Sequence, residues 1–427
     1  MTEAIGISML GAGNVGGGVV EALQQGVERY AERVGRPLEL RRVLVRDAAR
    51  SRLGLTSEQL TTEIDELLDD DQTQIVIELM GGEEPAREYI ERALRSGRHV
   101  VTANKEVIAK HGAALLAVAA EHDVQLLYEA SVGGGIPIVH PLGRDLLSND
   151  VHAVTAIING TTNFMLTAMA QDGADYADVL AEAQRLGYAE PDPTADVEGI
   201  DAAYKLAILC GLAFHVSISP DEVVRQGITE LTASDFAYAA ELGHTIKLLA
   251  SGRIEDGELT ASVQPTLIAV DEPLAKVDGV LNAVQVEGDL VGSVVFEGPG
   301  AGAGPTAGAV LADVLDIARD LVADRAPTDG IAQTSAVVRA AAEHESRYYI
   351  RMTGANRPGV LAQVASTLGD HGINIASVIQ FGLDEGAPTE EFVITTYLAK
   401  VGRLREALDQ IGALDGIVVG NLLPMAT

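Results

Sequence analysis

The sequence has a single cysteine, no tryptophan and few basic residues. Because Cys210 is the only thiol, no disulfide can form within the chain, which is typical of a protein from a reducing cytoplasm. No uninterrupted apolar run is long enough to span a membrane, and residues 1–10 lack the basic start of a signal peptide. These absences favour a cytoplasmic protein, and the length of 427 residues predicts more than one domain.

Positive charge is scarce. Lysine and arginine total 30 against 62 aspartates and glutamates, which gives a formal net charge of −32. Because such a field repels phosphate backbones and anionic lipid surfaces, we expect neither nucleic acid nor a membrane as a partner. Apolar residues make up 47% of the chain, which is enough for a globular core.

Lysine is the rarer of the two basic residues and occurs at six positions, which are 105, 110, 205, 247, 276 and 400. An acidic, lysine-poor composition is expected of a salt-adapted proteome, because a well-hydrated acidic surface keeps proteins in solution at high ionic strength. A GC-rich genome that favours arginine and alanine codons explains the same composition. Unfolding measured across a series of salt concentrations separates these two explanations.

The first 130 residues alternate short apolar runs with helical patterns. Strands are expected at 5–10, 38–45, 74–80, 99–102 and 125–129, and helices over 15–33, 85–97 and 105–121. Strands that alternate with helices predict βαβ units and a parallel sheet covered on both faces. The fold class of this part is therefore α/β, with a Rossmann-like sheet.

The rest of the chain predicts α+β structure. A strand is expected at 151–158, strand-like alternation covers 260–296, and a glycine-rich loop at 298–304 leads into a helix over 305–322. From Tyr348 onward the pattern is a compact βαββαβ arrangement, typical of a ferredoxin-like module.

A glycine motif lies near the start of the chain. Gly11-Ala12-Gly13-Asn14-Val15-Gly16 directly follows an apolar strand and begins a helical pattern, as in a dinucleotide-binding loop. The first glycine permits a tight turn, the second lets the backbone approach a pyrophosphate, and the third lets helix and strand pack closely. The N–H groups at the helix start would then bind the phosphates. The alternative is an ordinary glycine-rich turn.

The residues after the second strand are expected to select the cofactor's ribose. Arg46 is followed by Asp47, with Arg50 and Arg52 just beyond. Arginines at this place suit a 2′-phosphate, whereas an acidic residue suits a free 2′-hydroxyl. The sequence therefore favours NADP, with NAD possible because of Asp47.

Two lysines lie where proton chemistry would need them. Thr102-Ala103-Asn104-Lys105 ends a strand of the parallel sheet, and ligands bind at the carboxyl ends of such strands. Lys205 lies four residues after Asp201 in a helical segment that is apolar on most sides, so the two share one face. Charges on a buried helix must be paired or face a polar cleft. Lysine can release and regain a proton, which arginine effectively cannot.

Six segments together resemble homoserine dehydrogenase, in order and spacing, across residues 5–325. They are GAGNVGGGV (11–19), TANKEVIA (102–109), YEASVGGGIPI (128–138), INGTTNF (158–164), GYAEPDPTADVEGIDAAYK (187–205) and GPGAGAGPTAGAV (298–310). The last eighty or so residues resemble an ACT domain. The resemblance implies four parts: a nucleotide-binding domain at 1–130 completed by a helix near 305–325, a catalytic and dimerisation domain at 131–304, a connector at 326–346 and an ACT regulatory domain at 347–427.

The resemblance also implies the reaction and its residues. A monofunctional member would interconvert L-aspartate 4-semialdehyde and L-homoserine with NAD(P), on the route to threonine, methionine and isoleucine. Lys205 would give a proton to the developing alkoxide, and Lys105 would contact cofactor and substrate. The substrate would also be bound by Glu190, Asp196 and Asp201. The cofactor would be bordered by the glycine motif, Arg46, Thr102, Gly187 and Gly302.

Two further sites follow from the resemblance. A monovalent cation such as Na⁺ would be bound by the carbonyls of Val132, Gly134 and Ile136, with Glu129 nearby. An amino-acid effector, expected to be L-threonine acting as a feedback inhibitor, would bind near Asn356, Gly359 and Asn374. The chain would form a homo-oligomer, a dimer or tetramer. Alternatively, the ACT-like part only supports assembly.

Two other functions stay open at this point. The first is a different NAD(P) oxidoreductase that acts on another small amino-acid aldehyde. The second is a non-catalytic amino-acid sensor that binds a nucleotide. The set Lys105, Glu190, Asp201 and Lys205 argues against a sensor, which does not need two poised lysines.

Overall fold

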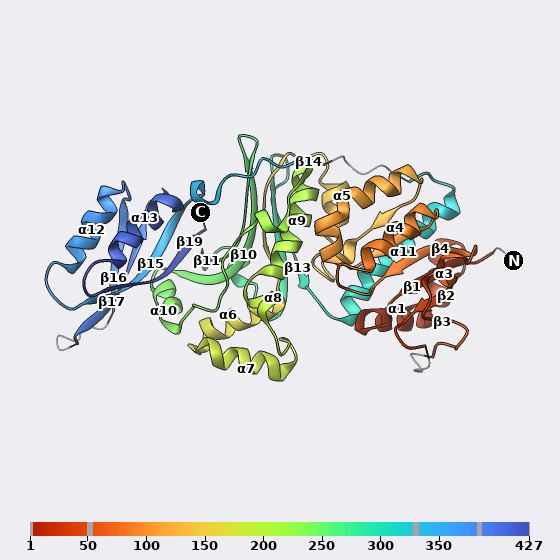
Figure 1. The fold of residues 1–427 in the computed structure, drawn as a ribbon, viewed down its shortest axis with the longest axis horizontal. Helices are drawn as coiled ribbons and strands as arrows, with labels where there is room; N and C mark the ends of the chain where they lie inside the picture. Colours follow the sequence, from red (N-terminus) through yellow and green to blue (C-terminus); the bar gives the residue numbers. More distant parts are fainter. Residues whose placement is uncertain (1–2, 49–53, 328–332, 382–386, 427) are drawn as a thin grey trace. The chain divides into compact units, whose positions relative to one another are not determined.

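The structure is a computed structural model that describes residues 3–48, 54–327, 333–381 and 387–426. It contains two compact units, each built from three stretches of chain. The first unit comprises Met1–His152, Tyr204–Pro220 and Val286–Ser335, and the second comprises Ala153–Ala203, Asp221–Gln285 and Ala336–Thr427. Figure 1 shows the helices and strands of both units, coloured along the sequence from red at the N-terminus to blue at the C-terminus.

The first unit is built on a parallel six-stranded sheet in the order β3-β2-β1-β4-β5-β6. Its strands are β1 (Ile5–Leu10), β2 (Leu38–Leu44), β3 (Leu60–Thr61), β4 (Thr73–Glu78), β5 (His99–Thr102) and β6 (Leu126–Leu127). Its helices include α3 (Ile64–Leu68), α4 (Ala86–Arg95) and α5 (Lys105–Glu121). This strand order is that of dinucleotide-binding sheets, so the predicted Rossmann-like fold is confirmed.

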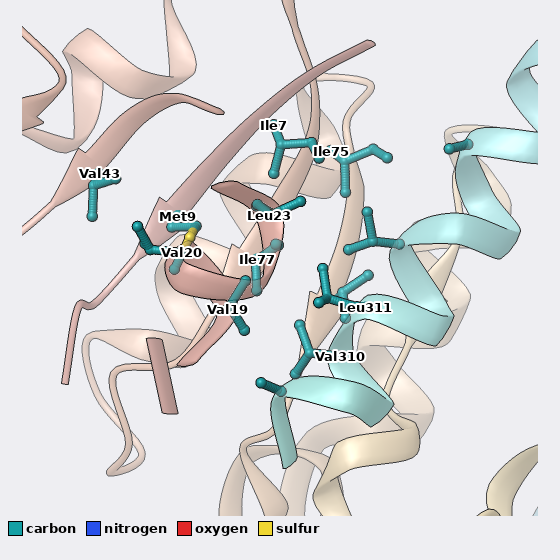
Figure 2. Close-up of a cluster of buried hydrophobic side chains, with 14 of the residues drawn as sticks. Ile7, Met9, Val19, Val20, Leu23, Val43, Ile75, Ile77, Val310 and Leu311 are labelled. Carbon is teal, nitrogen blue, oxygen red and sulfur yellow. The ribbon is translucent and has the colours of Figure 1, made fainter. Parts of the chain in front are cut away.

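Helix α11 (Ala303–Ala323) packs against this sheet although it lies far later in the sequence. Every residue of β1 is buried, as expected of a central parallel strand covered on both faces. Figure 2 shows Val310 and Leu311 of α11 facing the side chains of Val19, Ile75 and Ile77. Burial of this apolar cluster is the main force that holds α11 to the N-terminal strands.

The single helix predicted over 15–33 is wrong in one respect, because the structure has two helices. They are α1 (Asn14–Gln25) and α2 (Val27–Val34), and they meet at Gly26. A Cβ atom at Gly26 would lie 2.3 Å from the ring of Tyr30, so only glycine lets the chain turn this closely over that side chain. The break allows Tyr30 and Val34 to reach the core.

His99 at the start of β5 is expected to lower the stability of the folded chain in mild acid. Burial lowers the pKa of His99, and the backbone N–H of Gln125 donates to its Nδ1 over 3.1 Å. A histidine whose pKa is lower when folded costs stability as pH falls below about 6.5, since the unfolded chain then takes up the proton first. We expect the unfolding midpoint to fall less steeply between about pH 6.5 and 5 in His99→Asn, which keeps an acceptor for Gln125. Thermal unfolding across that range measures it, and parallel curves for the two proteins contradict it.

The second unit is built on a mixed sheet whose strands run in the order β7-β10-β11-β19-β15-β17-β16. Short strands β9 (Val224–Arg225) and β18 (Ala399–Lys400) flank β11 and β15. The strands are β7 (Val151–Ile157), β10 (His244–Glu255), β11 (Glu258–Ala269), β15 (Glu345–Ala355), β16 (Ile375–Gln380), β17 (Thr389–Thr396) and β19 (Ile417–Met425). The helices are α6 (Gly160–Asp172), α7 (Tyr176–Leu186), α8 (Thr194–Val197), α10 (Ala233–Glu241), α12 (Val360–Asp370) and α13 (Val401–Gly412).

The expected alternation over 260–296 corresponds to β11, β12 (Leu281–Gly288) and β13 (Gly292–Pro299). The sequence reading missed β10, which pairs with β11 along its whole length. The middle of β10 is buried on both faces and includes Lys247, so it shows no alternation of apolar and polar residues. Because period-two patterning signals only half-buried strands, it did not find this one.

The βαββαβ module is formed by β15, α12, β16, β17, α13 and β19, with a core of its own. Its last strand also joins β11: Leu267 pairs with Met425, and the N–H of Ala426 donates to the Leu267 carbonyl. The module therefore shares one continuous sheet with the strands that precede it.

Asp235 in the first turn of α10 joins the module to the rest of the second unit. Its carboxylate is fully buried and accepts hydrogen bonds from Tyr349 Oη (3.1 Å) and Arg351 Nε (2.8 Å) of β15, and from Asn421 Nδ2 (2.7 Å) of β19. It also closes a capping box with Thr232. Burial, and then the nearby carboxylate, raise the pKa of Tyr349, so this side chain donates at any ordinary pH.

In the described part of the chain, no helix is both long enough and apolar enough to cross a membrane.

Candidate active site

The glycine motif lies between β1 and α1, where the mechanism of dinucleotide binding requires it. Gly11 has a φ of 99°, and a Cβ there would lie 2.7 Å from the Leu79 carbonyl oxygen. A Cβ at Gly16 would lie 2.7 Å from the Gly11 carbonyl oxygen, whereas a Cβ at Gly13 would meet nothing within 4 Å. Gly11 and Gly16 thus permit the tight turn, and Gly13 leaves space beside the backbone.

The N-terminus of α1 is suited to an anion. The helix has no side-chain cap and no acidic residue in its first turn, so no carboxylate of that turn opposes the binding of an anion. Ala12, Asn14 and Val15 are only partly covered or exposed. These features fit the pyrophosphate of a dinucleotide.

The residues expected to select the ribose follow β2. Arg46 and Asp47 are both exposed after the strand ends at Leu44. Arg50 and Arg52 lie outside the described residues.

The buried carboxylate of Glu78 accepts hydrogen bonds from residues at the ends of β4 and β5. The Thr102 hydroxyl donates to Glu78 over 2.6 Å, and the Met80 N–H donates over 2.7 Å. Burial raises the pKa of Glu78, although these hydrogen bonds act in the opposite direction. Glu78 therefore fixes the loop after β4 to the end of β5.

Asn104 connects the end of β5 to the start of α5, where Lys105 lies. Its N–H donates to the Thr102 hydroxyl (2.9 Å), its Nδ2 donates to the Gly82 carbonyl (2.7 Å), and its Oδ1 caps α5 by accepting the Val107 N–H. Lys105 is the first residue of α5 and is partly buried. The sequence reading placed Thr102 and Lys105 at the carboxyl edge of the sheet but did not single out Glu78 or Asn104. The role of Glu78 depends on a contact between two strands, and that of Asn104 depends on the helix cap and on its contact with Gly82.

The loop expected to bind a monovalent cation is a compact turn folded around Glu129. Burial disfavours ionisation of this carboxylate, but the His140 side chain and the N–H groups of residues 138–140 all donate to it, and its pKa is lowered. Hydrogen bonding to Glu129 raises the pKa of His140 to about 9. Gly133 and Gly134 have φ values of 73° and 57°. Val132, Gly134 and Ile136 are buried, and a Cβ at Gly134 would lie 2.3 Å from the Gly300 carbonyl oxygen.

Asp313 on α11 contacts the same turn, at Glu129 and His140. Its Oδ2 accepts the N–H of Glu129 over 2.9 Å, which joins the turn to the helix that completes the N-terminal sheet. Burial raises the pKa of Asp313 to about 8. The sequence reading did not single out His140 or Asp313 for this role.

In the second unit, the segment 187–201 brings two of the predicted substrate residues together. Asp196 on α8 and Asp201 at the start of α9 (Ile200–Phe214) both accept hydrogen bonds from Asn159 Nδ2, over 2.7 and 3.0 Å. Asp201 is buried, whereas Asp196 is partly exposed. The sequence reading did not identify Asn159, although it lies within the segment INGTTNF.

Glu190 lies in an exposed loop anchored by its neighbours. Gly187 ends α7 with a φ of 78°, and the Thr161 hydroxyl of α6 donates to the Tyr188 carbonyl over 2.7 Å. Tyr188 also packs edge-on against Phe164, with ring centroids 5.0 Å apart. Gln184 donates to the carbonyl of Glu190, so the backbone is held and the carboxylate faces solvent.

Lys205 is partly buried on α9, one helical turn after Asp201. In the first unit, its neighbour Tyr204 lies under Lys110, whose Nζ is 5.6 Å from the ring centre.

Gly302, which was expected to border the cofactor, directly precedes α11 and has a φ of 115°.

The predicted effector residues lie in exposed parts of the βαββαβ module. Asn356 follows β15 and its N–H donates to the Pro388 carbonyl. Gly359 precedes α12 with a φ of 96°, and the Asn374 carbonyl accepts the N–H of Tyr397.

Three family models match consecutive parts of the chain. "Homoserine dehydrogenase, NAD binding domain" matches residues 11–129, "Homoserine dehydrogenase" matches 137–315, and "ACT domain" matches 348–416. A homoserine dehydrogenase from Synechocystis sp. is 42% identical over 428 residues, which cover 98% of each chain. The chain belongs to the homoserine dehydrogenase family. It is therefore an NAD(P)-dependent oxidoreductase with a C-terminal ACT domain, which confirms the resemblance drawn from the sequence.

Solved structures agree with this assignment. The crystal structure of a homoserine dehydrogenase from Thiobacillus denitrificans has a TM-score of 0.92 and 39% identity, covering 99% of this chain and 98% of that chain. A hyperthermophilic archaeal homoserine dehydrogenase in complex with NADPH has a TM-score of 0.63 and 29% identity, covering 74% of this chain and 97% of that chain. The alternative of a non-catalytic sensor is thus excluded, and the cofactor is a nicotinamide dinucleotide.

Proposed function

We propose that this homoserine dehydrogenase interconverts L-homoserine and L-aspartate 4-semialdehyde with NADP, with Lys205 as the proton donor and acceptor. A bound nicotinamide supplies or accepts the hydride at the substrate's C4 carbon. In the reducing direction the aldehyde oxygen gains negative charge as the hydride arrives, and the Lys205 ammonium gives it a proton. In the oxidising direction neutral Lys205 takes the hydroxyl proton as the hydride leaves.

The placement of Lys205 one helical turn after Asp201 on α9 carries this proposal. The helix fixes their spacing at four residues, and Asp201 is buried and held by Asn159. A lysine at this point can exchange a proton, whereas the arginines common elsewhere in the chain cannot. Lys105 would help to polarise the carbonyl from the edge of the parallel sheet, and Glu190 and Asp196 would bind the substrate's ammonium group.

The preference for NADP is supported by Arg46 and by the NADPH complex of the archaeal relative. We expect Arg46→Ala to raise KM for NADP⁺ by about tenfold, because a hydrogen bond to a charged group contributes about 1.5–3 kcal/mol. KM for NAD⁺ should change much less. Initial rates with each cofactor measure this, with the exposed Arg33→Ala as the matched control. Equal effects on both cofactors would show that Arg46 does not contact the 2′-phosphate.

The turn around Glu129 supports a structural monovalent cation such as Na⁺. Glycines at 133 and 134 let the chain turn tightly, and the carbonyls of the buried residues Val132, Gly134 and Ile136 would bind the ion. Glu129 would contribute negative charge while its own lone pairs hold the backbone of residues 138–140. The cation would stabilise the turn and take no part in the chemistry.

The ACT domain supports feedback inhibition by L-threonine bound near Asn356, Gly359 and Asn374. We expect Asn356→Ala to raise the threonine concentration for half-inhibition by at least about tenfold, the loss of one hydrogen bond to a charged ligand. The exposed Gln363→Ala on α12 serves as the control. If threonine does not inhibit the unaltered enzyme, the ACT domain has another effector or serves assembly alone.

Removal of the whole ACT domain does not test this proposal cleanly. Truncation near residue 345 would remove β19 from its place beside β11 and take away the donors to Asp235. A truncated enzyme would lose activity through damage to the second unit, whatever the role of threonine.

The assembly and location are further parts of the proposal. We expect a homo-oligomer, a dimer or tetramer, which light scattering of the purified protein measures. The single, buried thiol of Cys210 supports a reducing compartment such as the cytoplasm, and burial raises its pKa to about 12, so it is unreactive.

A further inference from the structure

Asn159 connects two acidic residues that come from different helices. It lies directly before α6, is 6% exposed, and donates through Nδ2 to Asp196 Oδ1 (2.7 Å) and Asp201 Oδ2 (3.0 Å). Both hydrogens of its amide are thus directed at carboxylates. Hydrogen bonds to ionised acceptors are the shorter and stronger kind.

The orientation of this amide is fixed by its other end. Asn159 Oδ1 accepts the backbone N–H of Thr162 (2.9 Å) and the Thr162 hydroxyl (3.0 Å), so it also caps α6. A flipped amide would direct its oxygen at two carboxylates and its nitrogen at an N–H donor. The helix cap therefore determines that the NH₂ group faces Asp196 and Asp201.

The two carboxylates need such a donor. Asp196 belongs to α8, which has only four residues and gains little from helix cooperativity, while Asp201 lies in the first turn of α9. Like charges in one site repel and favour protonation of one member. The Asn159 amide donates to both and gives each a fixed partner, so the direction of both is held.

Helix α6 is itself anchored one turn further along. Asn163 Nδ2 donates to the carbonyls of Val277 (3.0 Å) and Leu281 (3.1 Å). Buried Lys247 donates to the Val277 carbonyl (2.7 Å) and to Asp278 (3.0 Å). The side chain of Asn163 has the same chemistry as that of Asn159, but its acceptors are neutral and belong to a structural turn.

We propose that Asn159 is a positioning residue for the reaction, which acts by holding Asp201 toward Lys205 and Asp196 toward the substrate. This inference rests on the proposed function. Asn159 does not exchange protons or contact the hydride. Its contribution is the direction of the two carboxylates.

Two substitutions separate the cap of α6 from the donor. Serine caps helices as well as asparagine but is too short to reach both carboxylates, so Asn159→Ser keeps the cap and loses the donor. We expect its kcat/KM to fall by about 10²-fold, the cost of a small misplacement of reacting groups. Its unfolding midpoint should fall no further than that of Asn163→Ser, which also loses buried hydrogen bonds. Asn163→Ser is the matched control, since it removes the two hydrogen bonds that Asn163 Nδ2 donates and the one that its Oδ1 accepts from Lys247, and none of these involves a carboxylate.

Asn159→Asp supplies a signature that a structural role would not produce. Aspartate also caps the helix, but it adds a third carboxylate to the site, and one of the three must then bind a proton more readily. A protonated carboxyl can donate again in place of the amide. We expect the ratio of its kcat to that of the unaltered enzyme to rise as pH is lowered from about 8.5 to about 6.

The outcomes are distinct. Loss of kcat/KM in Asn159→Ser but not in Asn163→Ser, with the pH-dependent ratio in Asn159→Asp, supports the inference. If Asn159→Ser and Asn163→Ser lose activity equally, or the ratio for Asn159→Asp does not change with pH, Asn159 is only a helix cap. If the unaltered enzyme does not oxidise homoserine, the proposed function fails and this inference fails with it.

Discussion

Lys205→Ala is expected to lower kcat by about two to four orders of magnitude, the usual contribution of a positioned acid or base. Without Lys205, the alkoxide formed by hydride transfer has no proton donor at its side. Water would replace the ammonium group with a poorer orientation. Steady-state rates in both directions measure the loss.

Lys205→Arg distinguishes proton transfer from a purely structural ion pair with Asp201. Arginine keeps the positive charge but cannot release its proton at the pH of the reaction. If Lys205 exchanges protons, the arginine variant stays as inactive as the alanine variant. Recovery of most of the activity in Lys205→Arg would show that charge alone is needed. Binding of NADPH, followed by its fluorescence, verifies that each variant is folded.

Asp235→Ala is expected to have the largest effect on stability. Removal of this buried carboxylate takes the acceptor from Tyr349 Oη and from Arg351 Nε, while Arg351 Nη1 keeps its pair with Glu391 over 2.7 Å. It also breaks the capping box of α10. Breaking a buried ion pair by removing one partner costs about 3–5 kcal/mol. We expect a large fall in the thermal midpoint and a poor yield of folded protein.

Two variants control this experiment. Asp235→Asn keeps the shape and an acceptor oxygen, so its midpoint should lie between those of Asp235→Ala and the unaltered protein. Glu182→Ala removes an exposed carboxylate that pairs with Arg185 on α7, and such surface pairs contribute little. A midpoint for Asp235→Ala as high as that for Glu182→Ala would mean that the second unit does not depend on this connection.

The parallel sheet and the ACT domain were both predictable because their signals are local. An apolar strand, a glycine turn and an amphipathic helix follow each other within residues 5–25, and this order has one common structural meaning. The same holds for the βαββαβ pattern after residue 345. The sequence could not show that β19 pairs with β11, since the pairing joins residues about 160 positions apart through backbone hydrogen bonds alone.

The supporting residues of the site were not predictable for a similar reason. Lys105, Asp196, Asp201 and Lys205 lie in segments whose residue types are themselves informative. Asn159, by contrast, is defined by its partners, which lie 37 and 42 residues away. The scarcity of lysine was only a partial guide to the residues that exchange protons. Lys247 is buried and holds a turn through Val277 and Asp278, so lysine in this chain does not always indicate proton chemistry.

The central claim is tested most directly by homoserine-dependent reduction of NADP⁺ and of NAD⁺ by the purified protein, with and without threonine. We predict turnover with both L-homoserine and NADP⁺ present, a higher kcat/KM with NADP⁺ than with NAD⁺, and a lower rate when threonine is added. A folded protein that binds the nucleotide but reduces neither cofactor with homoserine would contradict the account and direct the search to another small amino-acid aldehyde.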